Sequence, residues 1–137
     1  MSVWNRACRR EQRGQSMLYI VMYHYVRDLA HSRYSDIKGL DVGSFRQQIS
    51  FLKANFTMVR MEEVLAALDG QTVLPDHAAL LTFDDGYIDH YTYVMPVLEE
   101  EKVQGSFFIP VKTFDTHRLL DVNKFHYILA GADMKKL

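Results

Sequence analysis

The chain has 137 residues, of which 16 are basic and 17 acidic, so its formal net charge is −1. This balance excludes a broadly cationic nucleic-acid-binding surface. A hydrophobic content of 48% with 24% charged residues is typical of a folded domain rather than a disordered chain. A single cysteine, Cys8, excludes an internal disulfide and any multi-cysteine metal centre. No apolar run approaches the roughly 20 residues that a membrane-spanning helix needs.

The first 16 residues differ in composition from the rest. They contain four arginines and lack apolar periodicity, so we predict a disordered leader over 1–16 and a folded domain over 17–137. A basic arm that touches an anionic partner is the alternative. The apolar stretch at 18–22 is too short for a secretory signal, which favours a cytoplasmic location over secretion or display at the cell surface.

The first half of the domain alternates strands and helices. We predict strands at 18–23 and 56–59 and helices at 44–55 and 61–68. The first strand is apolar throughout, which is typical of burial on both faces, and a polar loop follows it to residue 42. Ser44 begins a capping box, and Gly70 follows the end of the second helix. The first helix has an apolar face of Phe45, Ile49, Phe51 and Leu52.

The second half continues this alternation. We predict strands at 78–83 and 104–109 and helices at 87–102 and 122–130. Pro96 should kink or split the helix that contains it. The apolar positions of these two helices are Tyr91, Val94, Val97 and Leu98 in the first and Phe125, Ile128 and Leu129 in the second. Strand–helix alternation indicates an α/β fold with a mostly parallel sheet.

Two adjacent carboxylates, Asp84 and Asp85, directly follow the buried strand at 78–83. The carboxyl ends of parallel strands share one rim, so we expect these carboxylates to lie near His24, which follows the strand at 18–23. A divalent cation would relieve the repulsion between them, with one carboxylate as its ligand and the other as a base. For a bare Asp-Asp-Gly, however, a turn that caps the next helix is the favoured interpretation.

The context of this tripeptide is more specific. Leu81–Tyr87 (LTFDDGY) resembles the first motif of the polysaccharide deacetylases with a NodB-like domain, carbohydrate esterase family 4. Four further segments are similar to the family's surrounding elements: Met22–Val26, Phe45–Leu52, Pro96–Leu98 and Ser106–Ile109. The resemblance extends from about Met17 to Pro110. It reverses the preference for a simple turn.

The resemblance implies a distorted (β/α) barrel and a metal-dependent hydrolysis of N-acetyl groups on a saccharide. By position, Asp84 would be the general base and Asp85 a metal ligand, with zinc as the expected ion. His24 and Tyr87 are candidates for lining the site. For His24, the alternative is a strand-end histidine bonded to a carbonyl.

Part of the family's pattern is missing. The family's His-x-x-x-His motif has no counterpart among the six histidines, and a barrel of this type needs roughly 200 residues. We therefore predict an incomplete barrel that binds metal poorly and is inactive alone, with exposed sheet edges through which it self-associates. The alternatives are a non-catalytic interaction or structural fragment, and a cyclic-amide hydrolase on the same fold.

Several other polar and aromatic residues have weaker signals. We expect Asp89 and His90 on a solvated helix face, with contact between Asp89 and the site as the alternative. His126 is predicted to be an ordinary residue of an amphipathic helix. Three tyrosines near the rim are expected in the core more than stacked on a sugar: Tyr23, Tyr25 and Tyr87.

Overall fold

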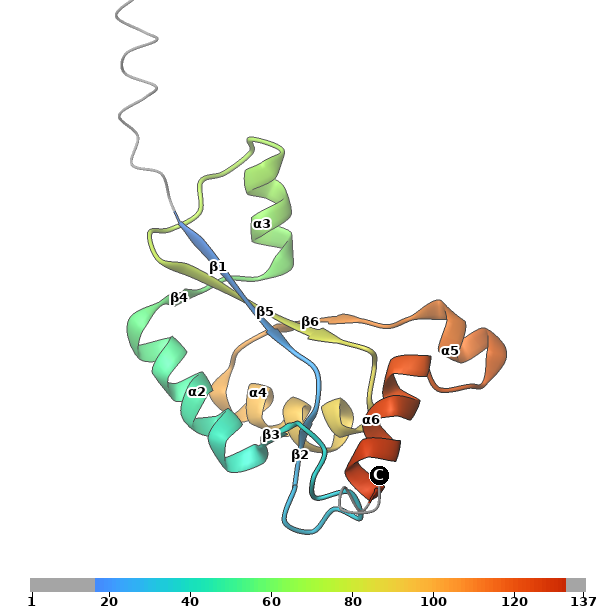
Figure 1. Cartoon of the computed structure of the whole chain (residues 1–137). Coiled ribbons are helices and arrows are strands. Elements are labelled where there is room, and N and C mark those ends of the chain that lie inside the picture. Colours follow the sequence, from blue (N-terminus) through green and yellow to red (C-terminus); the bar gives the residue numbers. More distant parts are fainter. Residues whose placement is uncertain (1–16, 133–137) are drawn as a thin grey trace, which may run out of the picture.

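The computed structural model describes residues 17–132 and shows the predicted α/β architecture, with four parallel strands of an incomplete (β/α) barrel (Figure 1). The predicted leader over 1–16 lies outside the described residues. The strands are β1 (Leu18–Tyr23), β4 (Thr57–Met58), β5 (Ala78–Asp84) and β6 (Gly105–Phe108). β1 pairs with residues 78–83 along one edge of β5. β4 pairs with the start of the other edge, and β6 pairs with its end.

Helices lie along parts of this sheet (Figure 1). They are α2 (Val42–Asn55), α3 (Met61–Leu68), a π-helical turn η1 (His90–Val94), α4 (Met95–Glu101), α5 (Val111–Thr116) and α6 (Asp121–Gly131). The predicted loop before α2 contains β2 (Val26–Arg27) and β3 (Leu40–Asp41), which form a separate two-stranded parallel sheet. Within residues 17–132, none of the helices combines the length and apolarity needed to cross a membrane.

The main core lies between one face of the sheet and the helices α2 and α4. Phe45, Ile49 and Leu52 of α2 are buried there with Leu81 and Phe83 of β5. Successive strand residues point to opposite faces, so the odd-numbered residues of β5 build this core. The predicted apolar face of α2 is therefore correct at three positions. Phe51 is the exception, because its side chain is exposed.

The opposite face of the sheet is only partly covered. Ala78 and Leu80 pack on this face against Val64 of α3. Further along the sheet, Ile20 and Met22 are each 60% exposed. The prediction that the first strand is buried on both faces is therefore wrong. Its physical reason is that α3 covers only the amino-terminal part of this face.

The predicted start of one helix and the predicted core position of Tyr91 are also corrected, whereas the predicted division of a helix at Pro96 agrees with the structure. The first long helix begins at Val42 rather than Ser44, because the Asp41 side chain accepts a hydrogen bond from the Gly43 backbone N–H at 2.8 Å and is the N-cap. Pro96 lies in the first turn of α4, where its missing N–H is tolerated, and the wider turn η1 precedes it. This turn shifts the helical register, so that Tyr91 is exposed instead of lying with Val94 and Val97 in the core.

Candidate functional site

The predicted rim residues come together at the carboxyl ends of β1 and β5. Tyr23 is in register with Phe83, so the residues that follow them, His24 and Asp84, are neighbours. The His24 Nε2 atom lies 4.0 Å from Asp84 Oδ2. Tyr23 itself packs in the core, with its ring stacked on Phe83 at 5.2 Å between centroids. It is therefore not a rim residue.

Asp84 is the last residue of β5 and faces the less covered side of the sheet. The alternation of the strand places it on the same face as Leu80 and Thr82, away from the core side of Leu81 and Phe83. Together with Asp85 it borders a shallow depression of about 420 Å³, whose other side is formed by residues 108–110. The carboxylate is therefore accessible to a small molecule such as water.

The turn after Asp84 depends on an unusual backbone conformation. Asp85 has φ +72° and Gly86 has φ +61°, both in the left-handed region. Aspartate tolerates this region better than most residues, and glycine adopts it freely. A Cβ atom on Gly86 would also approach the Ile109 Cγ2 atom to 2.8 Å. The shape of the turn therefore favours glycine at position 86 and is compatible with aspartate at position 85.

Tyr87 is connected to Asp85 through its hydroxyl group. The Tyr87 hydroxyl donates a hydrogen bond of 2.5 Å to Asp85 Oδ2. It also accepts one of 2.6 Å from the Asn123 side chain of α6. The Tyr87 ring stacks on the buried Tyr25 ring, with 4.3 Å between centroids. Burial, followed by the hydrogen bond to Asp85, raises the pKa of Tyr87 above its ordinary value, so this hydroxyl remains a donor at neutral pH.

Asp89 and His90 are buried, so the prediction of a solvated helix face is wrong. The Asp89 carboxylate forms a buried ion pair with Arg27, a residue of β2 that sequence patterns did not single out. The His90 Nε2 atom lies 2.7 Å from the His24 carbonyl oxygen and thereby fixes the backbone beside the rim. Burial lowers the pKa of the His90 imidazole, which favours its neutral form.

Asn123 and the cavity beside it are the features that sequence reasoning missed. A cavity of about 430 Å³ lies between the turn 85–89 and the α5–α6 segment, and Asn123, Tyr127 and Arg118 contribute to its wall. One signal was available: Asn123 is a polar residue near the start of a helix with an apolar stripe. His126, predicted as an ordinary helix residue, has its Nδ1 atom 3.3 Å from the Tyr25 hydroxyl.

The described residues do not fit a tight zinc site on their own. Across residues 17–132, no group of three or more histidine, cysteine, aspartate or glutamate side chains is arranged to hold a metal ion. Structural and catalytic zinc sites use at least three protein ligands. Asp84, Asp85 and His24 therefore do not form such a ligand set.

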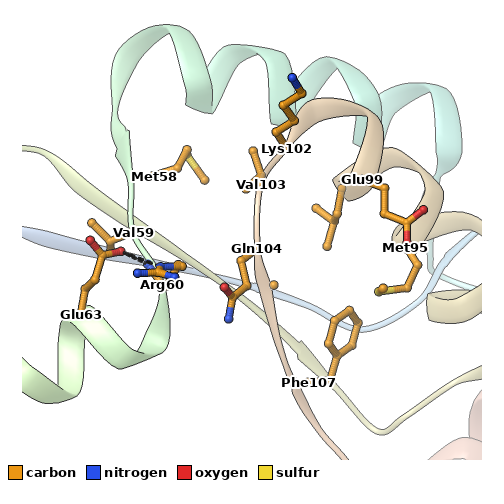
Figure 2. A pocket seen from close by; sticks show the side chains of 12 residues that line it. Met58, Val59, Arg60, Glu63, Met95, Glu99, Lys102, Val103, Gln104 and Phe107 are labelled. Carbon is orange, nitrogen blue, oxygen red and sulfur yellow. Dashed lines mark hydrogen bonds and ion pairs between the residues drawn. The ribbon is translucent and has the colours of Figure 1, made fainter.

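A second cavity, of about 530 Å³, is lined by neither Asp84 nor Asp85. Figure 2 shows the side chains that line it. The cavity opens between the end of β4, the start of α3, the end of α4 and the start of β6. Its wall mixes apolar side chains such as Phe107 and Met95 with the charged pair Arg60 and Glu63. None of the predicted site residues lines it, so the chemistry predicted from the sequence belongs to the rim of β1 and β5.

Comparisons with known proteins match this part of the chain to one family. Residues 71–128, which include the rim carboxylates, match the family model described as polysaccharide deacetylase. A poly-beta-1,6-N-acetyl-D-glucosamine N-deacetylase of Escherichia coli strain K12 is 33% identical over 81 residues. That match covers 58% of this chain and 12% of the curated relative, so the chain spans only a small part of that protein.

Solved structures give the same fold. A de-N-acetylase from Aggregatibacter actinomycetemcomitans is similar with a TM-score of 0.64 and 24% identity, covering 75% of this chain and 42% of that one. IcaB from Ammonifex degensii has a TM-score of 0.54 and 32% identity, covering 69% of this chain and 40% of that one. The chain therefore spans less than half of each of these two solved structures, and the predicted resemblance and fold are confirmed.

Proposed function

We propose, from the match of residues 71–128 to the polysaccharide deacetylase family model, that the chain supplies the catalytic carboxylates of an enzyme that removes N-acetyl groups from a saccharide polymer. The observation that carries the proposal is the convergence of His24, Asp84 and Asp85 at one rim. The curated relative acts on poly-beta-1,6-N-acetyl-D-glucosamine. Polymers of N-acetylglucosamine are therefore the favoured substrate class, ahead of cyclic amides.

In this proposal Asp84 is the general base. Its carboxylate is half-buried at the edge of an open depression, where it can accept a proton from a water molecule that attacks the acetyl carbon. The His24 Nε2 atom, 4.0 Å from Asp84 Oδ2, is close enough to hydrogen-bond the same water. His24 therefore lines the site and assists the base.

Asp85 is proposed as a ligand of a divalent ion, with zinc as the expected ion. A bound ion would polarise the acetyl carbonyl and acidify water. Because the described residues offer no set of three ligands, the proposal requires further ligands from outside residues 17–132. The 137-residue chain alone should thus bind zinc weakly and show no turnover. Sub-micromolar one-to-one binding in a calorimetric titration would contradict this.

The catalytic roles are tested by acetate release from an oligomer of β-1,6-linked N-acetylglucosamine. The enzyme is the longest natural polypeptide that contains this chain. Asp84→Asn and Asp85→Asn should each reduce turnover by at least about 100-fold, as expected for loss of a base or a metal ligand. Asp76→Asn, a change at an exposed aspartate in the loop before β5, is the matched control and should retain activity. Retained turnover in both site variants would refute the proposal.

The non-catalytic alternative is favoured by one observation, the lack of a three-ligand cluster in the described residues. A chain of this kind would act by association through its exposed strand β1, where Ile20 and Met22 face solvent. Sedimentation velocity at rising concentration tests this self-association. A monomer at the highest concentration would contradict it.

A further inference from the structure

Helix α6 contacts the rest of the molecule through its polar residues. Its large apolar side chains face solvent: Val122, Phe125, Ile128 and Leu129 are each at least 50% exposed. Its one fully buried residue is Asn123, which is 3% exposed. Amphipathic helices ordinarily bury the apolar stripe. We therefore look for the cause of the reversed orientation of α6 in the contacts of Asn123.

Asn123 contacts two tyrosine hydroxyls beside the motif turn. Its Nδ2 atom donates hydrogen bonds of 3.1 Å to the Tyr25 hydroxyl and 2.6 Å to the Tyr87 hydroxyl. A side-chain amide nitrogen carries two hydrogens, so it can satisfy both acceptors at once. The two tyrosine rings are stacked, which holds their hydroxyls at the spacing that one amide nitrogen can span.

The direction of these hydrogen bonds is fixed by Asp85. An ionised carboxylate only accepts, so the single proton of the Tyr87 hydroxyl must point to Asp85 Oδ2, at 2.5 Å. Tyr87 must then accept its second hydrogen bond, and only the nitrogen side of the Asn123 amide can donate it. Asn123 therefore donates a hydrogen bond to Tyr87, and Tyr87 donates one to Asp85.

We propose that Asn123 and Tyr87 are positioning residues that hold the Asp85 carboxylate in one orientation, with Oδ2 occupied and Oδ1 left free for its other partner. The inference rests on the proposed role of Asp85. The backbone of Asp85, directly after a buried strand, is in the left-handed region. The hydrogen bond from the Tyr87 hydroxyl restrains the side-chain torsions of Asp85. Helix α6, although 36 residues away from Tyr87 in sequence, thereby controls the motif. Outer hydrogen-bond partners of this kind typically change metal affinity or activity by about 10–100-fold when removed.

The decisive variant is Asn123→Asp, which preserves shape and reverses polarity. The new carboxylate can only accept, so it competes with Asp85 for the one proton of Tyr87. Tyr87→Phe removes the hydroxyl but retains the stack on Tyr25, so it decides the question even if Asn123→Asp fails to fold. Tyr91→Phe and Gln47→Glu, at exposed positions outside the network, are the matched controls.

The first measurement is structural and independent of activity. Proton NMR of the 137-residue chain should show a low-field, slowly exchanging hydroxyl signal from Tyr87. The signal should disappear in Tyr87→Phe, shift or broaden in Asn123→Asp and remain in Tyr91→Phe and Gln47→Glu. Absence of the signal in the parent chain, or an unchanged signal in Asn123→Asp, would overturn the inference.

The second measurement uses acetate release by the longest natural polypeptide that contains this chain. Tyr87→Phe and Asn123→Asp should each lower kcat about 10–100-fold with little change in KM. The double variant should be no worse than Tyr87→Phe, because Asn123 acts through Tyr87. If Asp85→Asn abolishes turnover but both positioning variants retain it, this inference fails and the proposed function stands. If Asp85→Asn retains turnover, the proposed function fails.

Discussion

Two regions of this molecule hold their helices in opposite ways. On the core side of the sheet, α2 buries Phe45, Ile49 and Leu52 and leaves its polar residues in solvent. In the carboxyl-terminal region, α6 buries Asn123 and exposes Phe125 and Ile128. Both helices have an apolar stripe. The comparison teaches that such a stripe predicts a helix but does not by itself predict which face packs against the described residues.

The energetic basis of the two attachments differs accordingly. Burial of α2 depends on the hydrophobic effect, which is proportional to apolar area and insensitive to direction. Attachment of α6 depends on a few hydrogen bonds and aromatic contacts, including Asn123 with Tyr87 and the Tyr127 ring edge on Tyr34 at 4.8 Å. These interactions are directional, so single substitutions can break them without loss of the core.

The largest expected effect tests the difference directly with two phenylalanines. Phe45→Ala removes a fully buried ring and should lower the free energy of unfolding by about 3–5 kcal/mol. Phe125→Ala removes a ring that is 65% exposed and should cost less than about 1 kcal/mol. Urea denaturation of both variants measures the two values. Equal losses would mean that α6 packs through its apolar stripe after all.

The next effect compares a buried ion pair with an exposed one. Asp89→Asn leaves the Arg27 guanidinium buried without its counter-charge and should destabilise the fold by about 3 kcal/mol. Glu100→Gln breaks the ion pair with Arg46; the Arg46 side chain is 46% exposed and the Glu100 side chain 61%. This change should lower the free energy of unfolding by less than about 1 kcal/mol. Both are read from urea midpoints at neutral pH. A small effect of Asp89→Asn would show that the pair does not tie β2 to η1.

A third and smaller effect concerns the motif turn. Gly86→Ala combines a left-handed backbone with a Cβ contact to Ile109 and should cost about 2–3 kcal/mol. Gly70 has φ +72°, and a Cβ atom added there would meet open space. Gly70→Ala should therefore lower the free energy of unfolding by only about 1 kcal/mol. The difference between the two variants in thermal unfolding isolates the Ile109 contact. If the two losses match, the contact at Gly86 relaxes at no cost.

Local hydrophobic patterns in the sequence predicted most of the strands and helices, because these elements are determined largely by residues close together in the chain. The helix Met61–Leu68 has its predicted bounds, and the strand that begins at Ala78 is one residue longer than predicted. The rim of His24 and Asp84 followed from parallel pairing alone. The burial of Asp89 did not, because its partner Arg27 is 62 residues away and carries no local signal. Asn123 had one local signal, its polar side chain near the start of a helix with an apolar stripe, but this signal does not reveal its contacts, which are with tyrosines far away in sequence.

The smallest expected effect is a dependence of stability on pH, which compares a buried histidine with an exposed one. His90 is buried, and protonation would place an N–H at Nδ1, which has no hydrogen-bond partner among the described residues. Its folded pKa is lowered, so the folded state binds fewer protons than the unfolded state, where the pKa is about 6.5. Stability should therefore be highest above that pH and should fall as the pH drops towards the folded pKa.

The matched variants for this prediction are His90→Gln and His117→Asn. Replacement of the buried His90 should flatten the dependence of the unfolding free energy on pH below the unfolded pKa of about 6.5, whatever its effect on absolute stability. Replacement of the exposed His117, whose left-handed backbone asparagine tolerates, should leave the slope unchanged. Because His90 also holds the His24 carbonyl at 2.7 Å, loss of the slope in His90→Gln would link the pH sensitivity of the fold to the backbone that carries the rim histidine. An unchanged slope would place that sensitivity at other groups.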